Sequence, residues 1–130
     1  TISARIEAEI AELPEEDAGE FRRDLGVEGG AAERIVRAIF ELMGRATFYT
    51  AAENEVRAWL IRRHTRAQEA AGGIHSDMER GFIRAEVVSY DALVEHGSWD
   101  AARKQGALRL EGKDYPVQDG DVLLIRFAAG

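Results

Sequence analysis

Apolar residues near the start of the chain recur at helical spacing. Four of them follow one another at intervals of four, four and three residues: Ile2, Ile6, Ile10 and Leu13. Such a stripe forms one face of an α-helix. Ser3 stands before the first turn, and its hydroxyl suits an N-terminal cap. The pattern therefore predicts a first helix that begins after Ser3.

Two further helices are predicted before residue 46. Pro14 and the three acidic residues at 15–17 suit the first turn of a helix, where negative charge is favoured by the helix dipole. Gly26 is expected to end this helix. A third apolar stripe covers about residues 31–43, with Gly44 as its stop. The first 45 residues are thus interpreted as a helical segment.

After residue 46 the pattern changes to that of strands. Residues 47–50 and 56–61 are rich in β-branched and aromatic side chains, and 51–54 suits a turn, so a β-hairpin is predicted. Residues 62–73 are interpreted as a loop rich in Arg, Ala and Gly. The S-x-x-E capping box at Ser76 predicts a short helix that begins there.

The rest of the chain is predicted to alternate between short strands and short helices. Strands are expected at 82–89, 108–110, 115–117 and 122–127, with turns at 111–113 and 119–121, and helical pieces at 91–96 and 99–105. The order from residue 46 is hairpin, helix, strand, helical segment, short strands and final strand. This order suits a small mixed sheet with one helix packed across it, which is the β-grasp plan. The predicted fold class is α+β.

Composition narrows the class of protein. The chain has 130 residues, of which 45% are hydrophobic and 32% charged, as in one ordinary domain or a small domain with a helical attachment. It contains no cysteine, which excludes disulfides and thiolate chemistry and fits a reducing compartment. No apolar run approaches the roughly 20 residues that span a bilayer. A cytoplasmic protein with no membrane role is expected.

Charge is distributed unevenly along the chain. Residues 1–45 hold 6 basic and 11 acidic residues, a net charge of −5, while residues 46–130 hold 11 and 13, a net charge of −2. This balance argues against binding nucleic acid over the whole surface, and no role at DNA is expected.

One local cluster of basic residues stands out against this acidic balance. Arg62, Arg63, His64 and Arg66 follow a predicted strand, and such a cluster can contact RNA phosphates. The alternative is a solvated loop that only balances the acidic surface.

No catalytic or metal site is predicted in this chain. His75, Ser76 and Asp77 have the residue types of a hydrolytic triad, but adjacent positions do not reach the geometry that a triad needs. The histidines are dispersed, and no H-E-x-x-H spacing is present.

Three stretches resemble a known family. Residues 74–87 (Ile-His-Ser-Asp-Met-Glu-Arg-Gly-Phe-Ile-Arg-Ala-Glu-Val) closely resemble the signature of the C-terminal domain of YchF/Obg-like ATPases. Residues 55–59 and 110–122 resemble the same domain, in the same order. That domain is a TGS domain with a ubiquitin-like β-grasp fold. The resemblance implies a TGS domain at 46–130, preceded at 1–45 by the helical C-terminal end of a P-loop G domain.

The resemblance also bears on nucleotide binding. Ser3, Ala4 and Arg5 resemble the last guanine-nucleotide motif of a G domain, which implies contact with the purine base in the intact parent. ATP or GTP with Mg²⁺ is implied for that parent, a P-loop ATPase/GTPase that associates with ribosomes. This chain has no G-x-x-x-x-G-K-[ST] loop, so no cofactor and no hydrolysis are expected of it alone.

Three functions remain open at this point. The first is a binding and regulatory module of a ribosome-associated ATPase, which recognises RNA, the ribosome or a protein partner. The second is a β-grasp module that binds only proteins. The third is the TGS domain of a tRNA synthetase or a stringent-response enzyme. The oligomeric state is not predicted.

Overall fold

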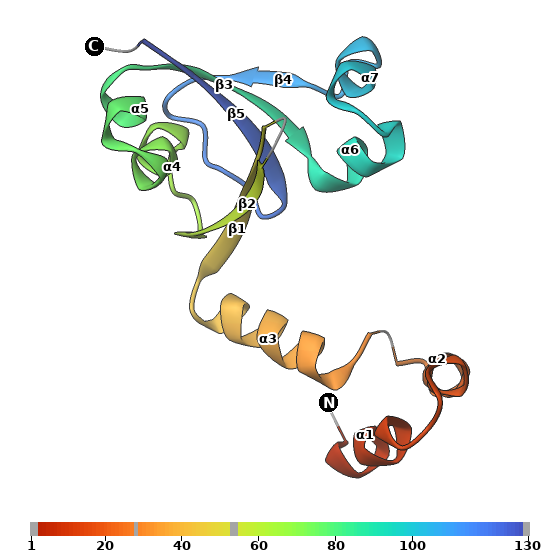
Figure 1. Cartoon of the computed structure of the whole chain (residues 1–130). Helices are drawn as coiled ribbons and strands as arrows, with labels where there is room; N and C mark the ends of the chain where they lie inside the picture. The colour runs from red at the N-terminus through yellow and green to blue at the C-terminus, as the bar shows by residue number, and fades with distance from the viewer. Residues whose placement is uncertain (1–2, 28, 53–54, 129–130) are drawn as a thin grey trace. The chain divides into compact units, whose positions relative to one another are not determined.

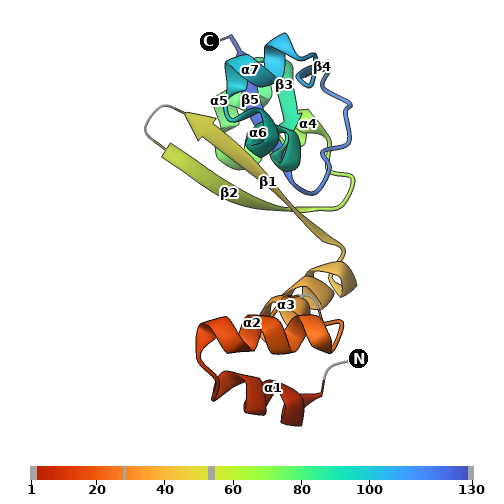
Figure 2. The ribbon, with the colours of Figure 1, turned by 90° about the vertical axis from the view of Figure 1, so that its right-hand side faces the viewer.

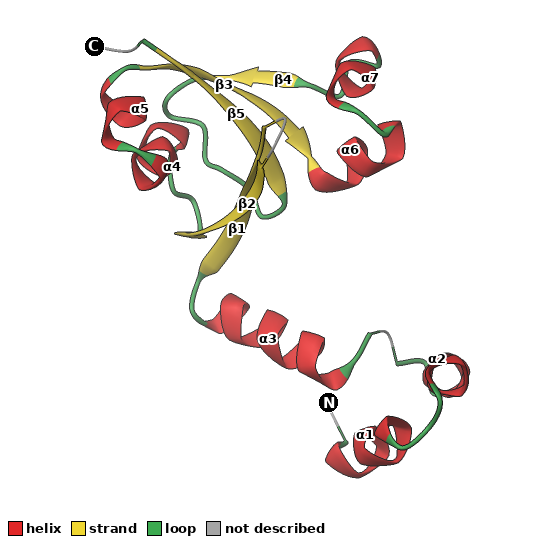
Figure 3. Ribbon diagram, in the orientation of Figure 1, coloured by secondary structure: helices red, strands yellow, loops and turns green. Residues whose placement is uncertain are grey.

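The chain forms two compact units. The computed structural model describes residues 3–27, 29–52 and 55–128, and it divides the chain into Thr1–Met43 and Gly44–Gly130 (Figure 1). The first unit is helical, and the second is built on a sheet (Figure 3). Within the described ranges, no helix is long and apolar enough to cross a membrane.

The first unit contains the three predicted helices, which are confirmed as α1 (Ala4–Ala11), α2 (Glu15–Asp24) and α3 (Ala31–Leu42). Ser3 caps α1, because its Oγ accepts a hydrogen bond from the backbone N–H of Ile6 at 3.5 Å. Helix α3 buries none of its side chains and exposes a row of large apolar ones: Ile35, Val36, Ile39, Phe40 and Leu42. Such a face is typical of a helix that packs on a further segment.

The second unit is a five-stranded mixed sheet. Its strands are β1 (Arg45–Ala52), β2 (Glu55–Arg62), β3 (Phe82–Ser89), β4 (Arg109–Glu111) and β5 (Asp121–Phe127), in the spatial order β2-β1-β5-β3-β4. The central pair β1–β5 is parallel, and the other neighbours are antiparallel. The parallel pair β1–β5 thus lies between β2 on one side and β3 and β4 on the other, and the predicted α+β, β-grasp fold is confirmed.

Helices cover both faces of this sheet. Helices α4 (Ala67–Ile74) and α5 (Ser76–Arg80) lie on one side, and α6 (Tyr90–His96) and α7 (Trp99–Lys104) lie on the other (Figures 1 and 2). The alternation of side chains along each strand therefore supplies two cores, one on each face.

The core beneath α4 is the larger one. Phe48, 1% exposed, lies at its centre between the buried alanines of α4 and the inward side chains of β3 and β5. The ring of Trp59 stacks on Phe48 with centroids 6.4 Å apart. The indole N–H of Trp59 donates to Thr50 Oγ1 at 2.9 Å. Trp59 is thus a core residue.

The second core lies beneath α6 and α7. Val88, Val122 and Ala102 are buried there, and Tyr49 and Trp99 pack against them. Burial of side chains on both faces explains why β5, in the middle of the sheet, carries the continuous apolar run of residues 122–125.

The prediction of a loop at residues 62–73 is wrong for most of these residues. Helix α4 begins at Ala67, and its residues Ala67, Ala70 and Ala71 are buried against the sheet. These residues follow the i, i+3, i+4 pattern of a helix, but small side chains and two adjacent glycines weaken that signal. Tertiary packing forms the helix where intrinsic propensity is low.

Three local predictions are also corrected. The helix at Ser76 is confirmed, but its cap is His75, whose Nδ1 accepts from the N–H of Asp77 at 3.1 Å. The hairpin strands are longer than predicted, because 51–52 belong to β1; residues 53–54 of the predicted turn lie outside the described residues. Residues 115–117 form an isolated bridge from Pro116 to Arg66 in place of a strand.

A buried carboxylate ties α7 to the sheet. Glu86 on β3 is 5% exposed, and it accepts hydrogen bonds from Arg126 at 2.8 Å and from Arg103 at 3.0 Å. The hydrogen bond from Arg126 holds the pKa of Glu86 below its usual value, against the effect of burial and with the help of Arg103. The ionised form of Glu86 therefore stabilises the fold.

This cluster predicts a specific dependence of stability on pH. Because the pKa of Glu86 is lower in the folded state, its contribution is present above the unfolded-state pKa and is lost as pH falls through the folded-state value. We expect Glu86→Gln to lower the free energy of unfolding by about 2 kcal/mol at pH 7. The difference from wild type should shrink as the pH falls below about 4.5.

Urea denaturation at several pH values measures this effect. Glu95→Gln is the matched control, because Glu95 is exposed on α6 and makes no ion pair with another described residue. An equal loss of stability in both variants, or a difference that persists unchanged in acid, would contradict the assignment.

Candidate functional site

The residues of the predicted basic cluster lie together in one connection, which we call the basic loop: residues 62–66, from the end of β2 to the start of α4. Its backbone is held in place at both ends. The N–H of Arg63 donates to the carbonyl of Gly44 at 2.8 Å, and the N–H of Val117 donates to the carbonyl of Thr65 at 3.0 Å. The backbone is fixed while the basic side chains project to the surface.

His64 sets the direction of this loop. Its φ is 66°, in the left-handed region that few residues other than glycine adopt. This conformation turns the chain out of β2, and the hydroxyl of Thr65 closes the turn by donating to the carbonyl of Arg62 at 2.8 Å. The four predicted basic residues are thereby presented from a tight turn.

The four residues differ in their charge environment. Arg62 and Arg63 are exposed, and neither makes an ion pair with any residue that the structure describes. Arg66 lies 3.4 Å from the carboxylate of Asp114, in a pair of which both members are about two-thirds exposed. Such a surface pair contributes little to stability, but it partly neutralises Arg66. Arg62 and Arg63 are the guanidinium groups available to an anion.

A small hollow lies beside the basic loop. Its volume is about 40 Å³, and its lining includes Arg63, His64 and Asp119. This space holds about one water molecule. The carboxylate of Asp119 accepts from the N–H of Thr47 at 2.7 Å and makes the hollow unfavourable for an anion. A phosphate would therefore meet the exposed guanidinium groups and not enter the hollow.

A buried aspartate positions the segment that anchors the basic loop. Asp121 is 2% exposed, and it accepts hydrogen bonds from the Tyr115 hydroxyl at 2.7 Å, the N–H of Gln118 at 2.9 Å and Arg109 at 3.3 Å. Burial, reinforced by Asp121, raises the pKa of Tyr115 to about 12. Tyr115 therefore stays protonated and donates to Asp121, which fixes the segment that carries Val117.

The three residues of the predicted nucleotide motif lie in the first unit. Ser3 Oγ is used by the cap of α1, and the guanidinium of Arg5 pairs with Glu9 at 3.1 Å. Across the described ranges, no group of three or more His, Asp or Glu residues lies close enough to hold a metal ion.

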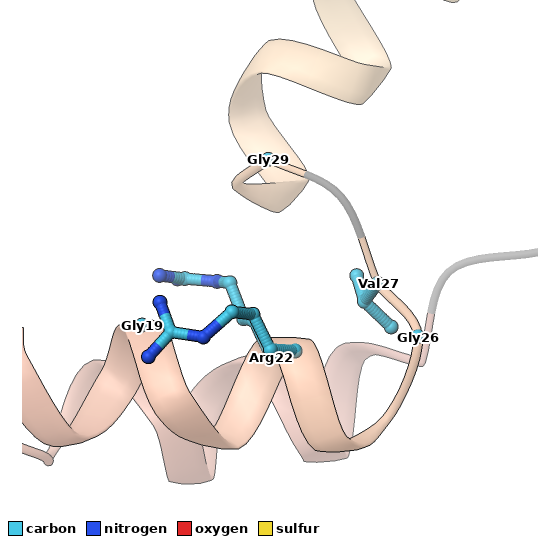
Figure 4. A pocket seen from close by; sticks show the side chains of 6 residues that line it. Gly19, Arg22, Gly26, Val27 and Gly29 are labelled. Carbon is cyan, nitrogen blue, oxygen red and sulfur yellow. The ribbon is translucent and has the colours of Figure 1, made fainter.

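A larger hollow lies within the first unit. Its volume is about 490 Å³, and it is lined by Gly19, Arg22, Arg23, Gly26, Val27 and Gly29 (Figure 4). The Nε of Arg22 is buried and has no hydrogen-bond partner among the described atoms, while its Nη2 lies 3.9 Å from Glu7. Residue 28, which falls between two of the lining glycines, lies outside the described residues.

Comparison with known proteins identifies the family. A family model named YchF-GTPase_C, described as a protein of unknown function (DUF933), matches residues 46–128. The chain is 48% identical over 126 residues to the ribosome-binding ATPase YchF of Bacillus subtilis (strain 168), covering 97% of this chain and 34% of that protein. It is 40% identical over 125 residues to Obg-like ATPase 1 of Oryza sativa subsp. japonica, covering 96% and 32%.

A solved structure supports the same relationship. The YchF GTPase of Schizosaccharomyces pombe superposes with a TM-score of 0.70 at 30% identity, over 91% of this chain and 31% of that one. The chain belongs to the YchF family and corresponds to its C-terminal portion. It spans about a third of the length of the curated relatives it matches. Membership of the YchF family is therefore favoured over a place in a tRNA synthetase or a stringent-response enzyme.

Proposed function

We propose that this chain is the ribosome-contacting, regulatory portion of a YchF-type ATPase, and that the basic loop contacts RNA. The observation that carries the proposal is the exposed pair Arg62 and Arg63, without ion pairs among described residues, on a chain whose net charge is −7. Positive charge held in a fixed turn on an acidic protein attracts phosphate locally and repels it elsewhere.

The intact parent would supply the chemistry. ATP or GTP hydrolysis with Mg²⁺ is proposed for it, with Ser3, Ala4 and Arg5 contributing to the purine-binding end of its G domain. Residues 1–45 would then belong to that G domain and 46–130 to the TGS domain. The exposed apolar face of α3 is consistent with packing on a segment upstream of this chain. A ribosomal partner would place the protein in the cytoplasm.

Charge reversal tests the RNA contact. We expect Arg62→Glu/Arg63→Glu/Arg66→Glu to weaken co-sedimentation with ribosomes at least about tenfold near 0.1 M salt, because phosphate contacts are replaced by repulsion. The measurement is the fraction of the chain that pellets over a range of ribosome concentrations.

A matched control carries the same change of charge elsewhere. Arg23, Arg84 and Lys104 are exposed and make no ion pair within the described ranges, so their joint reversal to Glu changes the net charge equally. This control should bind only slightly less than wild type. Equal losses in the two variants would show that net charge, and not the basic loop, governs binding.

A second candidate function is a purely protein-binding module. The observation that favours it is an apolar surface on the β1–β2 hairpin, on the face away from α4. Val56 is 75% exposed and Leu60 53% exposed on β2. Beside this face, Tyr90 of α6 is 54% exposed, and its ring is tilted against that of Tyr49 with the centroids 6.1 Å apart. Exposed aliphatic side chains of this kind are typical of protein interfaces.

One comparison separates the two candidates. Val56→Ser/Leu60→Ser removes apolar surface and leaves the basic loop intact. If this variant loses ribosome binding while the triple reversal retains it, the protein-binding function replaces the proposed RNA contact.

A further inference from the structure

The register of the first hairpin places two arginines directly opposite each other. Arg45, the first residue of β1, is the Cα partner of Arg62, the last residue of β2. Their side chains leave the same face of the sheet, because directly paired residues of an antiparallel ladder do so. Arg63 follows immediately, and its N–H bonds to the carbonyl of Gly44. Three arginines thus gather at the open end of the hairpin.

This arrangement is unfavourable for the isolated fold. Like charges directly opposite each other on a sheet are destabilising. Arg45 is also partly buried, which increases the cost of its charge. None of the three guanidinium groups makes an ion pair or a cation–π contact with a described residue. An anionic partner that binds at this end of the hairpin would neutralise the charges of both Arg45 and Arg62.

The chemistry of the three groups indicates the kind of anion. Guanidinium groups bind phosphate oxygens through planar, paired N–H donors. Several such groups at one end of a hairpin suit the successive phosphates of a nucleic-acid backbone better than a single anion. Arg66, another member of the predicted cluster, contributes less, because it is paired with Asp114.

We propose that the binding site is formed by Arg45, Arg62 and Arg63, and that it holds consecutive phosphodiesters of an RNA strand. This inference rests on the proposed RNA contact and changes its residues: it adds Arg45, which no sequence cluster includes, and assigns Arg66 a minor part. The contact is with the backbone and does not depend on base sequence.

Fluorescence anisotropy with a labelled, mixed-sequence 20-nucleotide single-stranded RNA tests the assignment on the full 130-residue chain. We expect Arg45→Gln and Arg62→Gln each to weaken binding about three- to tenfold near 0.1 M salt. Each substitution should make the negative slope of log K against log salt shallower by about 0.7, because one phosphate contact is lost. Arg66→Gln and Lys104→Gln should change both quantities much less, and Arg45→Lys should restore most of the binding.

A stability measurement accompanies the binding assay. Since Arg45 faces a like charge, Arg45→Gln should unfold at the same or a higher urea concentration than wild type. A lower midpoint would mean that Arg45 serves the fold, and this result would overturn the proposal. So would an Arg45→Gln variant whose RNA affinity matches that of Lys104→Gln.

The same assay distinguishes the class of ligand. Poly-glutamate presents carboxylates in place of phosphodiesters, and we expect it to compete only weakly with RNA. Competition equal to that of unlabelled RNA would point to acidic protein segments and overturn the proposal. The two proposals fail in different assays. If only the proposed ribosome contact is wrong, co-sedimentation with ribosomes does not depend on the basic loop, while Arg45→Gln still weakens binding of free RNA.

Discussion

Replacing Phe48 with alanine is expected to lower the free energy of unfolding of the second unit by about 3–5 kcal/mol. Phe48 is 1% exposed and lies where β1 meets both α4 and β5, with Trp59 stacked on its ring. Its removal costs apolar burial and leaves a cavity that the surrounding strands fill only in part. Phe48 is therefore expected to be among the most sensitive positions of the sheet.

Tryptophan fluorescence during urea denaturation measures this loss directly. Trp59 and Trp99 are the chain's two tryptophans, and both lie in the second unit, so the signal reports on the sheet. Phe127→Ala is the control, because Phe127 lies at the end of β5 and is 36% exposed. Equal midpoints for the two variants would contradict the central place of Phe48 in the core.

The second large loss of stability is expected when Asp121 is replaced. Asp121→Ala should lower the free energy of unfolding by about 3 kcal/mol, because charge-assisted hydrogen bonds are among the strongest and three donors lose their acceptor. Two of these donors, the Tyr115 hydroxyl and the N–H of Gln118, lie in the segment that anchors the basic loop. The same denaturation experiment provides the measurement.

Asp119→Ala provides a matched comparison for Asp121. Asp119 is an exposed aspartate in the same turn and accepts one described hydrogen bond, from Thr47. Its removal should cost about 1 kcal/mol. If Asp121→Ala is no more destabilising than Asp119→Ala, the buried carboxylate does not organise this segment as described.

The fold was largely predictable because its strands carry strong local signals. The strand at 82–89 and the three N-terminal helices were predicted with nearly the observed bounds. Helix α4 was missed because alanine and glycine give it little apolar contrast; the sheet that buries Ala67 and Ala70 is what forms it. The helical spacing of these alanines, together with Ile74, is the sequence signal that indicates helix α4.

The site was only partly predictable. The basic cluster at 62–66 is visible in the sequence because its members are consecutive. Arg45 was missed since it is 17 positions from Arg62, and only the strand register brings the two together. The pairing of Arg66 with Asp114, which separates it from its neighbours, likewise depends on a tertiary contact. Sequence clustering indicates the region of the proposed site, and the strand register adds Arg45 to it.

The salt dependence of ribosome co-sedimentation by the wild-type chain tests the central claim most directly. If Arg45, Arg62 and Arg63 contact RNA phosphates, log K should fall linearly with log salt, with a slope of about −2 to −3. Ribosome binding that persists with a slope near zero would contradict an RNA-backbone contact. It would instead assign recognition to the apolar hairpin surface of Val56 and Leu60.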